Sequence, residues 1–226
     1  MPSLTVENYV KAIYQIEAKA PNEPVATGQL ATALDVSPGT VTSMLKTLSD
    51  SGLTTYTRYE GVRLTDSGRA LALRVLRRHR LIELFLVRTL ELTWDEVHDE
   101  AEHMEHAVSD LLVDRIDAFL GHPRVDPHGD PIPRSDGTLA ADPQAGQALA
   151  NCAAGFAFRL VRVIDQSSKF LRYLTETGLG LGSFGRVTAN RDEAGILTIK
   201  VDGNETTLAR EAAEKLIVTE EKAERP

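Results

Sequence analysis

The chain has 226 residues, enough for roughly two or three small domains, and its 42% hydrophobic and 26% charged content is ordinary for a folded protein. The single cysteine, Cys152, excludes an internal disulfide and a thiolate-rich zinc ribbon. The net charge of −8 is unevenly spread, since residues 1–80 hold 10 Lys/Arg against 7 Asp/Glu whereas residues 81–226 hold 15 against 26.

The slightly basic N-terminal part is compatible with nucleic-acid contact at one end of the chain. The sequence does not open with a signal-peptide pattern, and no run of about 18 apolar residues indicates a membrane span. We therefore expect a cytoplasmic protein without a membrane partner.

The N-terminal stretch predicts two helices. Residues 4–18 carry apolar side chains at three- and four-residue spacing, which favours a helix capped by Thr5. Thr27 is expected to cap a second, shorter helix that ends at Leu34.

A third helix, over residues 39–48, is expected to start from Ser37 as its cap with Pro38 at its first position. Two short helices joined by a tight turn form a helix-turn-helix, whose second helix enters the major groove of DNA. The alternative is a helical hairpin that packs only for its own stability. The residues expected to contact DNA here are Thr27, Ser37, Pro38, Gly39, Thr40, Thr42, Ser43 and Lys46.

Residues 53–64 alternate in polarity, are rich in β-formers and turn at Glu60-Gly61. A two-stranded hairpin after a helix-turn-helix is a wing. Arg58 and Arg63 are candidates for phosphate contact there, and the alternative for each is a solvated surface charge.

Two long helices are expected next. Thr65 is predicted to cap a helix that continues to about Leu90, and Thr93 a helix from Trp94 to about Leu120. The second helix has enough apolar surface for packing against another helix or subunit.

These two helices carry most of the potential metal ligands. His79 and Glu83 lie one turn apart, a pair suited to a metal ion. Each such residue alone is more often a solvated helix residue, but two sets on shared faces favour a divalent cation. The second set, expected on one helical face, is His98, Glu102, Glu105 and His106.

Five prolines and several glycines in residues 121–147 indicate a linker or an ordered loop. After Phe156, five short β-like runs with two intervening helices predict a small SH3-like barrel. The expected fold is α+β. Its expected parts are a winged helix-turn-helix (1–70), a helical metal-binding and dimerisation domain (71–140), a linker (141–154) and an SH3-like domain (155–226).

The chain resembles the diphtheria-toxin-repressor family of metal-dependent transcriptional regulators over nearly its whole length. The motifs that carry the resemblance are Arg78-His-Arg-Leu-Ile-Glu83, Val97-His-Asp-Glu-Ala101, Glu105-His106 and Gly129-Asp-Pro-Ile-Pro133.

The resemblance implies two metal sites per subunit. The effector site takes Glu102, Glu105 and His106 together with a ligand at the position of Asn8, for which Glu7 is the alternative. The ancillary site takes His79, Glu83 and His98. In three-domain members it is completed from the segment that here holds Asp165, Gln166 and Lys169, and Arg80 matches a residue that helps hold an anion beside it.

The choice of metal follows from three positions. Iron-type members have cysteine and methionine where this chain has Glu102 and Asn8, whereas manganese-type members have glutamate and aspartate. Lys11 stands where small manganese-type members place a glutamate. Carboxylate, amide and imidazole donors suit Mn²⁺ or Fe²⁺ better than thiolate-preferring ions, and Mn²⁺ is favoured.

The predicted function is a homodimeric, metal-dependent repressor that binds double-stranded operator DNA and controls metal-uptake genes. No organic small-molecule substrate is expected. One alternative is a constitutive winged-helix regulator with purely structural metals, and another is an enzyme with a two-metal site.

Overall fold

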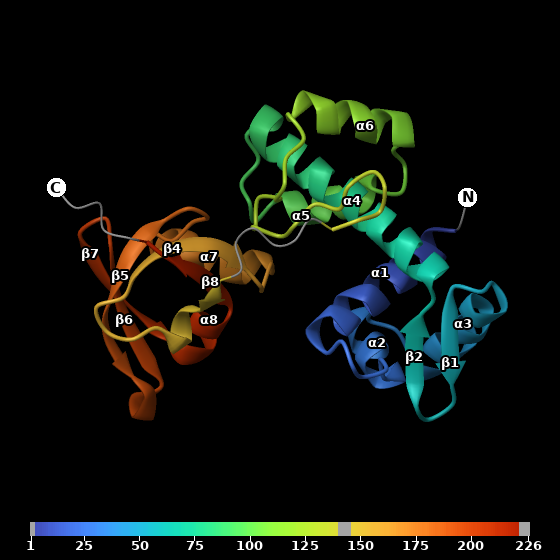
Figure 1. The fold of residues 1–226 in the computed structure, drawn as a ribbon, viewed down its shortest axis with the longest axis horizontal. Helices are drawn as coiled ribbons and strands as arrows, with labels where there is room; N and C mark the ends of the chain where they lie inside the picture. Colours follow the sequence, from blue (N-terminus) through green and yellow to red (C-terminus); the bar gives the residue numbers. More distant parts are fainter. Residues whose placement is uncertain (1–2, 140–145, 222–226) are drawn as a thin grey trace. The chain divides into compact units, whose positions relative to one another are not determined.

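The structure is a computed structural model that describes residues 3–139 and 146–221 (Figure 1). Its described residues form two compact units. The first unit holds the residues up to 79 with 105–109 and 133–138, and the second holds 80–104, 110–132 and those from 139 onward. The boundary passes through the 25-residue helix α4 (Asp66–Leu90), directly after His79.

The first unit contains the predicted winged helix-turn-helix (Figure 1). Thr54 to Thr57 pair in antiparallel register with Leu64 to Gly61, which forms the wing. Leu30, Val41 and Leu48 are fully buried in the core beneath it. The elements are α1 (Leu4–Lys19), α2 (Thr27–Ala33), α3 (Pro38–Asp50), β1 (Thr54–Thr57) and β2 (Gly61–Leu64).

Two predicted helix caps are wrong. Helix α1 is capped by the side chain of Ser3, not Thr5, because the helix begins at Leu4 and Thr5 already lies in its first turn. Helix α2 already includes Thr27, and its N-cap is Ala26, whose backbone N–H donates to the Gln29 side chain at 2.8 Å. The glutamine thus makes the reciprocal bond of a capping box, whereas Ala26 has no side-chain oxygen that could accept from the first turn.

The predicted single helix from Trp94 to about Leu120 is also wrong. Helix α5 (Val97–Met104) ends before Glu105, and α6 (Asp110–Phe119) begins five residues later. The apolar periodicity continues across this break, so the sequence pattern does not reveal it. Buried ion pairs at Glu105 draw the intervening turn into the first unit, and tertiary contacts of this kind override helix propensity.

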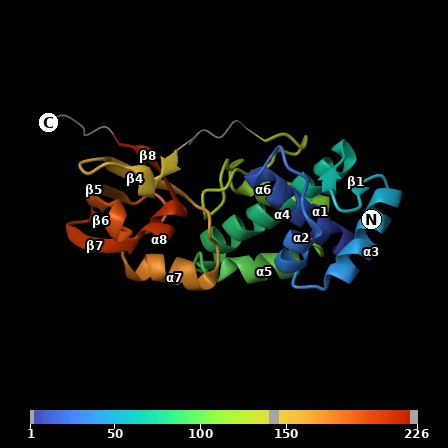
Figure 2. The ribbon, with the colours of Figure 1, turned by 90° about the horizontal axis from the view of Figure 1, so that it is seen from below.

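The second unit also contains a six-stranded sheet with strand order β3-β8-β4-β5-β6-β7. Figures 1 and 2 show β5, β6 and β7 side by side. Phe158, Leu160 and Val187 from the sheet pack with Leu171 and Leu174 in its core. The strands are β3 (Gln147–Ala148), β4 (Ala157–Val163), β5 (Phe184–Arg191), β6 (Ile196–Val201), β7 (Asn204–Ala209) and β8 (Leu216–Glu220), with helices α7 (Ser168–Glu176) and α8 (Arg210–Glu214).

The five predicted strands are all present, and the α+β class is confirmed. The sequence misses β3, a two-residue strand that pairs with β8. In the described ranges, no helix is long and apolar enough to cross a membrane.

Candidate metal centres and nucleic-acid interface

Glu105 is the centre of a buried cluster in the first unit. Its side chain is fully buried, and the ammonium of Lys11 lies 2.6 Å from its Oε1. The Nδ1–H of His79 donates to its Oε2 at 2.7 Å. Burial by itself would raise the pKa of Glu105, but the hydrogen bond from His79 and the charge of Lys11 outweigh burial and lower it. Glu105 is therefore held as a carboxylate.

His106 lies beside Glu105 with its ring oriented by Glu7. The Nδ1–H of His106 donates to Glu7 Oε2 at 2.7 Å, and Arg78 pairs with the other oxygen of Glu7 at 3.4 Å. In the neutral form of the His106 imidazole the lone pair is therefore on Nε2, which lies 3.1 Å from Glu105 Oε1. A carboxylate that orients an imidazole in this way is typical of histidine metal ligands.

Several buried polar atoms of the first unit have no hydrogen-bond partner in the described part of the chain. Two of them, Nε2 of His106 and the amide oxygen of Asn8, belong to residues of the predicted effector site. Buried polar atoms are nearly always satisfied, so orphaned acceptors fit a bound cation. Because Glu7 is engaged with His106, Asn8 is the better candidate for the ligand from α1. Glu102 lies half-buried on α5.

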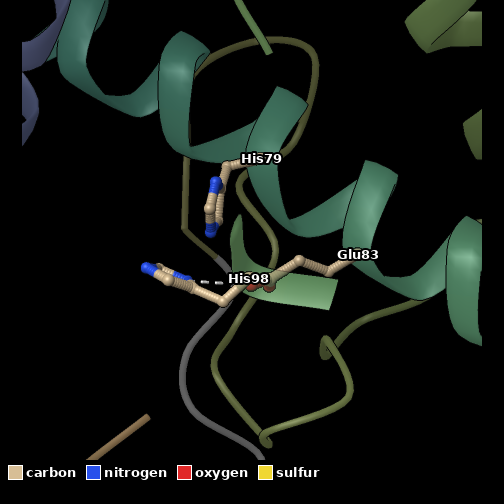
Figure 3. A group of neighbouring side chains, drawn as sticks. All are labelled: His79, Glu83 and His98. Carbon is tan, nitrogen blue, oxygen red and sulfur yellow. Dashed lines mark hydrogen bonds and ion pairs between the residues drawn. The ribbon is translucent and has the colours of Figure 1, made fainter. Parts of the chain in front are cut away.

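Glu83 is fully buried on α4, one turn after His79, and the Nδ1 of His98 lies 3.3 Å from its Oε1 (Figure 3). The structure thus brings Glu83 and His98 together as predicted. The Nδ1–H of His79, however, is directed at Glu105.

A third group of ligand-type side chains contains two residues that the sequence reasoning missed. Ligand atoms of Glu83, Asp126 and His128 all lie within 4.8 Å of one another, and all three side chains are buried. The Nε2–H of His128 donates to the Trp94 carbonyl oxygen at 2.8 Å, so the lone pair of Nδ1 faces Glu83 Oε2 at 3.8 Å. Two acceptors facing each other in a buried site need a cation or a proton between them.

The pKa values of Asp126 and His128 also indicate that this group favours an added positive charge. Burial, with the nearby charges of Glu83 and Asp130, raises the pKa of Asp126 to about 7. Burial alone would lower the pKa of His128, but the carboxylates of Glu83 and Asp126 outweigh it and raise that pKa. Several carboxylates close together in a buried site favour a bound cation, and Arg80 supplies part of that positive charge.

The loop that carries Asp126 and His128 is packed against strand β4. The N–H of Val163 donates to the His128 carbonyl oxygen at 2.9 Å. Gly129 has a φ of 89°, and a Cβ there would collide with the backbone of Val161. The segment 121–139 is therefore the ordered loop that the sequence left as one of two alternatives. An Asp-x-His-x-Asp spacing at 126–130 was the available signal for these ligands.

Most of the other residues that the resemblance assigned to the ancillary site contact side chains of this chain. The resemblance implies that Arg80 helps hold an anion. In this chain Arg80 pairs with the carboxylates of Asp126 and Asp130, which supply that negative charge. Gln166 donates to Asp130 at 2.8 Å, and Asp165 pairs with Lys215 at 2.8 Å. Lys169, the third of the candidates from the SH3-like segment, is exposed.

The start of α3 is formed as predicted. Ser37 caps the helix by accepting from the Thr40 N–H at 3.2 Å, and Pro38 is its first residue. Thr27 and Thr42 are half-buried, and the Thr42 hydroxyl donates to the Pro38 carbonyl oxygen. The exposed members of the predicted DNA-contacting set on this helix are Ser37, Pro38, Gly39, Thr40, Ser43 and Lys46.

The two wing arginines differ. Arg58 is exposed at the tip, with its guanidinium 4.8 Å from the ring centroid of Tyr59. Arg63 is half-buried, and its Nη2 donates to the Asn22 carbonyl oxygen at 2.6 Å. Arg63 therefore connects the wing to the segment that follows α1.

A winged helix-turn-helix combined with buried carboxylate–imidazole clusters defines a metal-responsive DNA-binding protein. Models of known families match the same parts of the chain. They are the N-terminal DNA-binding domain of iron-dependent repressors at residues 1–62, their metal-binding and dimerisation domain at 65–134, and the FeoA domain at 147–220.

Similar proteins cover nearly the full chain. The iron-dependent repressor IdeR of Mycobacterium tuberculosis is 32% identical over 92% of this chain and 94% of its own length. A solved manganese-dependent transcriptional repressor in complex with manganese is 41% identical, with a TM-score of 0.85 over 95% of this chain and 99% of that one. ScaR with bound Zn²⁺ is 34% identical, with a TM-score of 0.79 over 97% and 100%.

The chain belongs to the diphtheria-toxin-repressor family of metal-dependent transcriptional regulators. This confirms the family, the function class and the SH3-like third part that were predicted from the sequence.

Proposed function

We propose that the chain is a homodimeric repressor whose binding to operator DNA is activated by Mn²⁺, with Fe²⁺ as the alternative, and that it controls metal-uptake genes. The observation that carries the proposal is the pair of orphaned acceptors, Asn8 Oδ1 and His106 Nε2, in the unit that also holds the recognition helix. The hard oxygen donors and the similarity to manganese-dependent repressors support Mn²⁺.

The effector cation would be held by Asn8, Glu105 and His106, with Glu102 from α5 as predicted from the sequence. When bound, it supplies positive charge that favours the arrangement in which these donors converge. Glu7 and Arg78 hold the His106 ring so that Nε2 is available. Asn8 belongs to α1, which shares a hydrophobic core with the recognition helix α3.

For a second ion we propose Glu83, Asp126 and His128. This second site is supported by the raised pKa of Asp126 and by the Nδ1 of His128, which faces Glu83. The set predicted from the sequence, His79, Glu83 and His98, shares only Glu83 with it. The two sets are therefore separable by substitution.

The test of the DNA-binding proposal is selection of duplexes from a random-sequence pool, with Mn²⁺ and with a chelator. We expect enrichment of a two-fold symmetric duplex with Mn²⁺ only, its half-sites about 34–36 Å apart or a multiple of this. Enrichment of the same duplex with chelator would favour the constitutive regulator.

Lys46 is proposed to contact a phosphate, since it is exposed on α3. Replacing Lys46 with glutamine is expected to weaken binding to all duplexes and to reduce the slope of log affinity against log salt by about 0.9. The measurement is a salt titration of DNA affinity by fluorescence anisotropy, with Lys200→Gln on β6 as control. An unchanged slope would remove Lys46 from the interface.

The dimer interface is proposed to include α6, which presents three exposed apolar side chains. Leu111 and Phe119 are each 70% exposed, and Leu112 is 47% exposed. In a two-fold dimer a truncation acts twice. Leu111→Ala is therefore expected to raise the dimer dissociation constant at least about tenfold, given roughly 1 kcal/mol or more per buried copy.

Analytical ultracentrifugation across a concentration series measures this dissociation constant. Leu4→Ala, another exposed leucine on α1, is the matched control and should leave it unchanged. Equal dissociation constants for Leu111→Ala and the unmodified chain would place the interface elsewhere.

A further inference from the structure

Lys11 occupies an unusual place for a cation. Its side chain is 8% exposed, and its ammonium lies 2.6 Å from Oε1 of the fully buried Glu105. The same oxygen lies 3.1 Å from His106 Nε2, the orphaned acceptor of the effector site. A metal ion held by His106 Nε2 and Glu105 would therefore lie beside the oxygen that the Lys11 ammonium contacts.

The charges of this part of the first unit are balanced by the chain itself. Glu105 is paired with Lys11, and Glu7 with Arg78. Adding a divalent cation next to Glu105 would place two positive charges within a few ångströms of the Lys11 ammonium. At such a separation the repulsion is strong even with an effective dielectric constant of about 20.

We propose that Lys11 is a tethered competitor of the effector cation. In the metal-free chain its ammonium holds Glu105, and it must leave that carboxylate before Glu105 can serve as a metal ligand. This inference rests on the proposed function and adds that Lys11 sets the metal concentration at which the regulator responds.

The size of the effect follows from the population of the ion pair. The apparent dissociation constant is the intrinsic one divided by the fraction of molecules that can bind. If the Lys11–Glu105 pair is closed in about nine-tenths of metal-free molecules, its removal lowers the apparent dissociation constant for Mn²⁺ about tenfold. Pairing that is more complete gives a larger change.

The test is isothermal titration of the full-length, metal-free protein with Mn²⁺ for the unmodified chain, Lys11→Met and Lys19→Met. Methionine keeps the length of the side chain without its charge. Lys19 is exposed near the end of the same helix and is the matched control. We expect a dissociation constant about tenfold lower for Lys11→Met at the effector site and no change for Lys19→Met.

Lys11→Gln is the second variant, because its amide can still donate to Glu105 if Lys11→Met does not fold. It is expected to bind Mn²⁺ more tightly than the unmodified chain. A folded Lys11 variant whose dissociation constant is unchanged or higher would overturn the competition. Absence of Mn²⁺ binding by the unmodified chain would instead overturn the proposed function, so the two failures are distinguishable.

A structure with Mn²⁺ bound gives a readout independent of affinity. The competition predicts that the Lys11 ammonium no longer contacts Glu105 Oε1 in that structure. A retained contact beside a bound ion would contradict it.

Discussion

Glu105→Gln is expected to weaken Mn²⁺-dependent DNA binding at least about 100-fold, because loss of even an outer-shell partner of a metal ligand costs about 10–100-fold. Glu105 is the buried carboxylate that meets Lys11, His79 and His106. Glutamine keeps its shape but removes the negative charge that a divalent cation requires. The measurement is DNA affinity by fluorescence anisotropy at a fixed, saturating Mn²⁺ concentration.

The matched control is Glu100→Gln, the same change at an exposed position on α5. It should leave DNA affinity unchanged. Circular dichroism must show that Glu105→Gln remains folded, since Lys11 loses its charged partner. Full DNA affinity in a folded Glu105→Gln chain would show that this carboxylate is not a ligand of the activating metal.

Loss of one bound metal ion is expected for His128→Ala. In the group of Glu83, Asp126 and His128, the imidazole is the nitrogen donor. Its removal leaves only the two carboxylates as donors. We expect the Mn²⁺ content to fall from two ions to one per subunit, as measured by equilibrium dialysis with elemental analysis.

Two comparisons make this result specific. His122→Ala, at an exposed histidine of the same loop, should keep both ions. His98→Ala should also keep both if the second ion lies at Glu83, Asp126 and His128. Should His98→Ala lose an ion while His128→Ala keeps both, the sequence-predicted set of His79, Glu83 and His98 would hold it instead.

The sequence predicted the elements whose determinants are local. The Ser37-Pro38 start of α3 is a cap and a first-turn proline, both readable from adjacent residues. The runs that became β4, β6 and β8 largely alternate in burial, because one face of the sheet packs into the core that contains Phe158 and Leu160. Such patterns are set by near neighbours in the chain.

The parts that were missed depend on partners distant in the sequence. Helix α5 ends before Glu105 because Lys11, 94 residues away, and His79 hold that carboxylate in the first unit. Asp126 and His128 stand in a proline-rich stretch that the sequence leaves as a linker or an ordered loop. The fold brings them close to Glu83 by packing this stretch against β4.

The prediction that His98, Glu102, Glu105 and His106 share one helical face is wrong. His98 and Glu102 lie on α5, whereas Glu105 and His106 lie in the turn after it. His98 meets Glu83, and His106 meets Glu7. The break of the helix thus leaves Glu102 on the same helix as His98, whereas the family resemblance groups Glu102 with Glu105 and His106.

The central claim is that metal gates DNA binding. Its most direct test is the affinity of the full-length chain for a duplex selected with Mn²⁺, titrated anaerobically against Mn²⁺, Fe²⁺ and Zn²⁺ from a metal-free start. We predict weak, sequence-independent binding without metal and tight binding as Mn²⁺ or Fe²⁺ saturates the effector site. Tight, sequence-specific binding by the metal-free chain would contradict it.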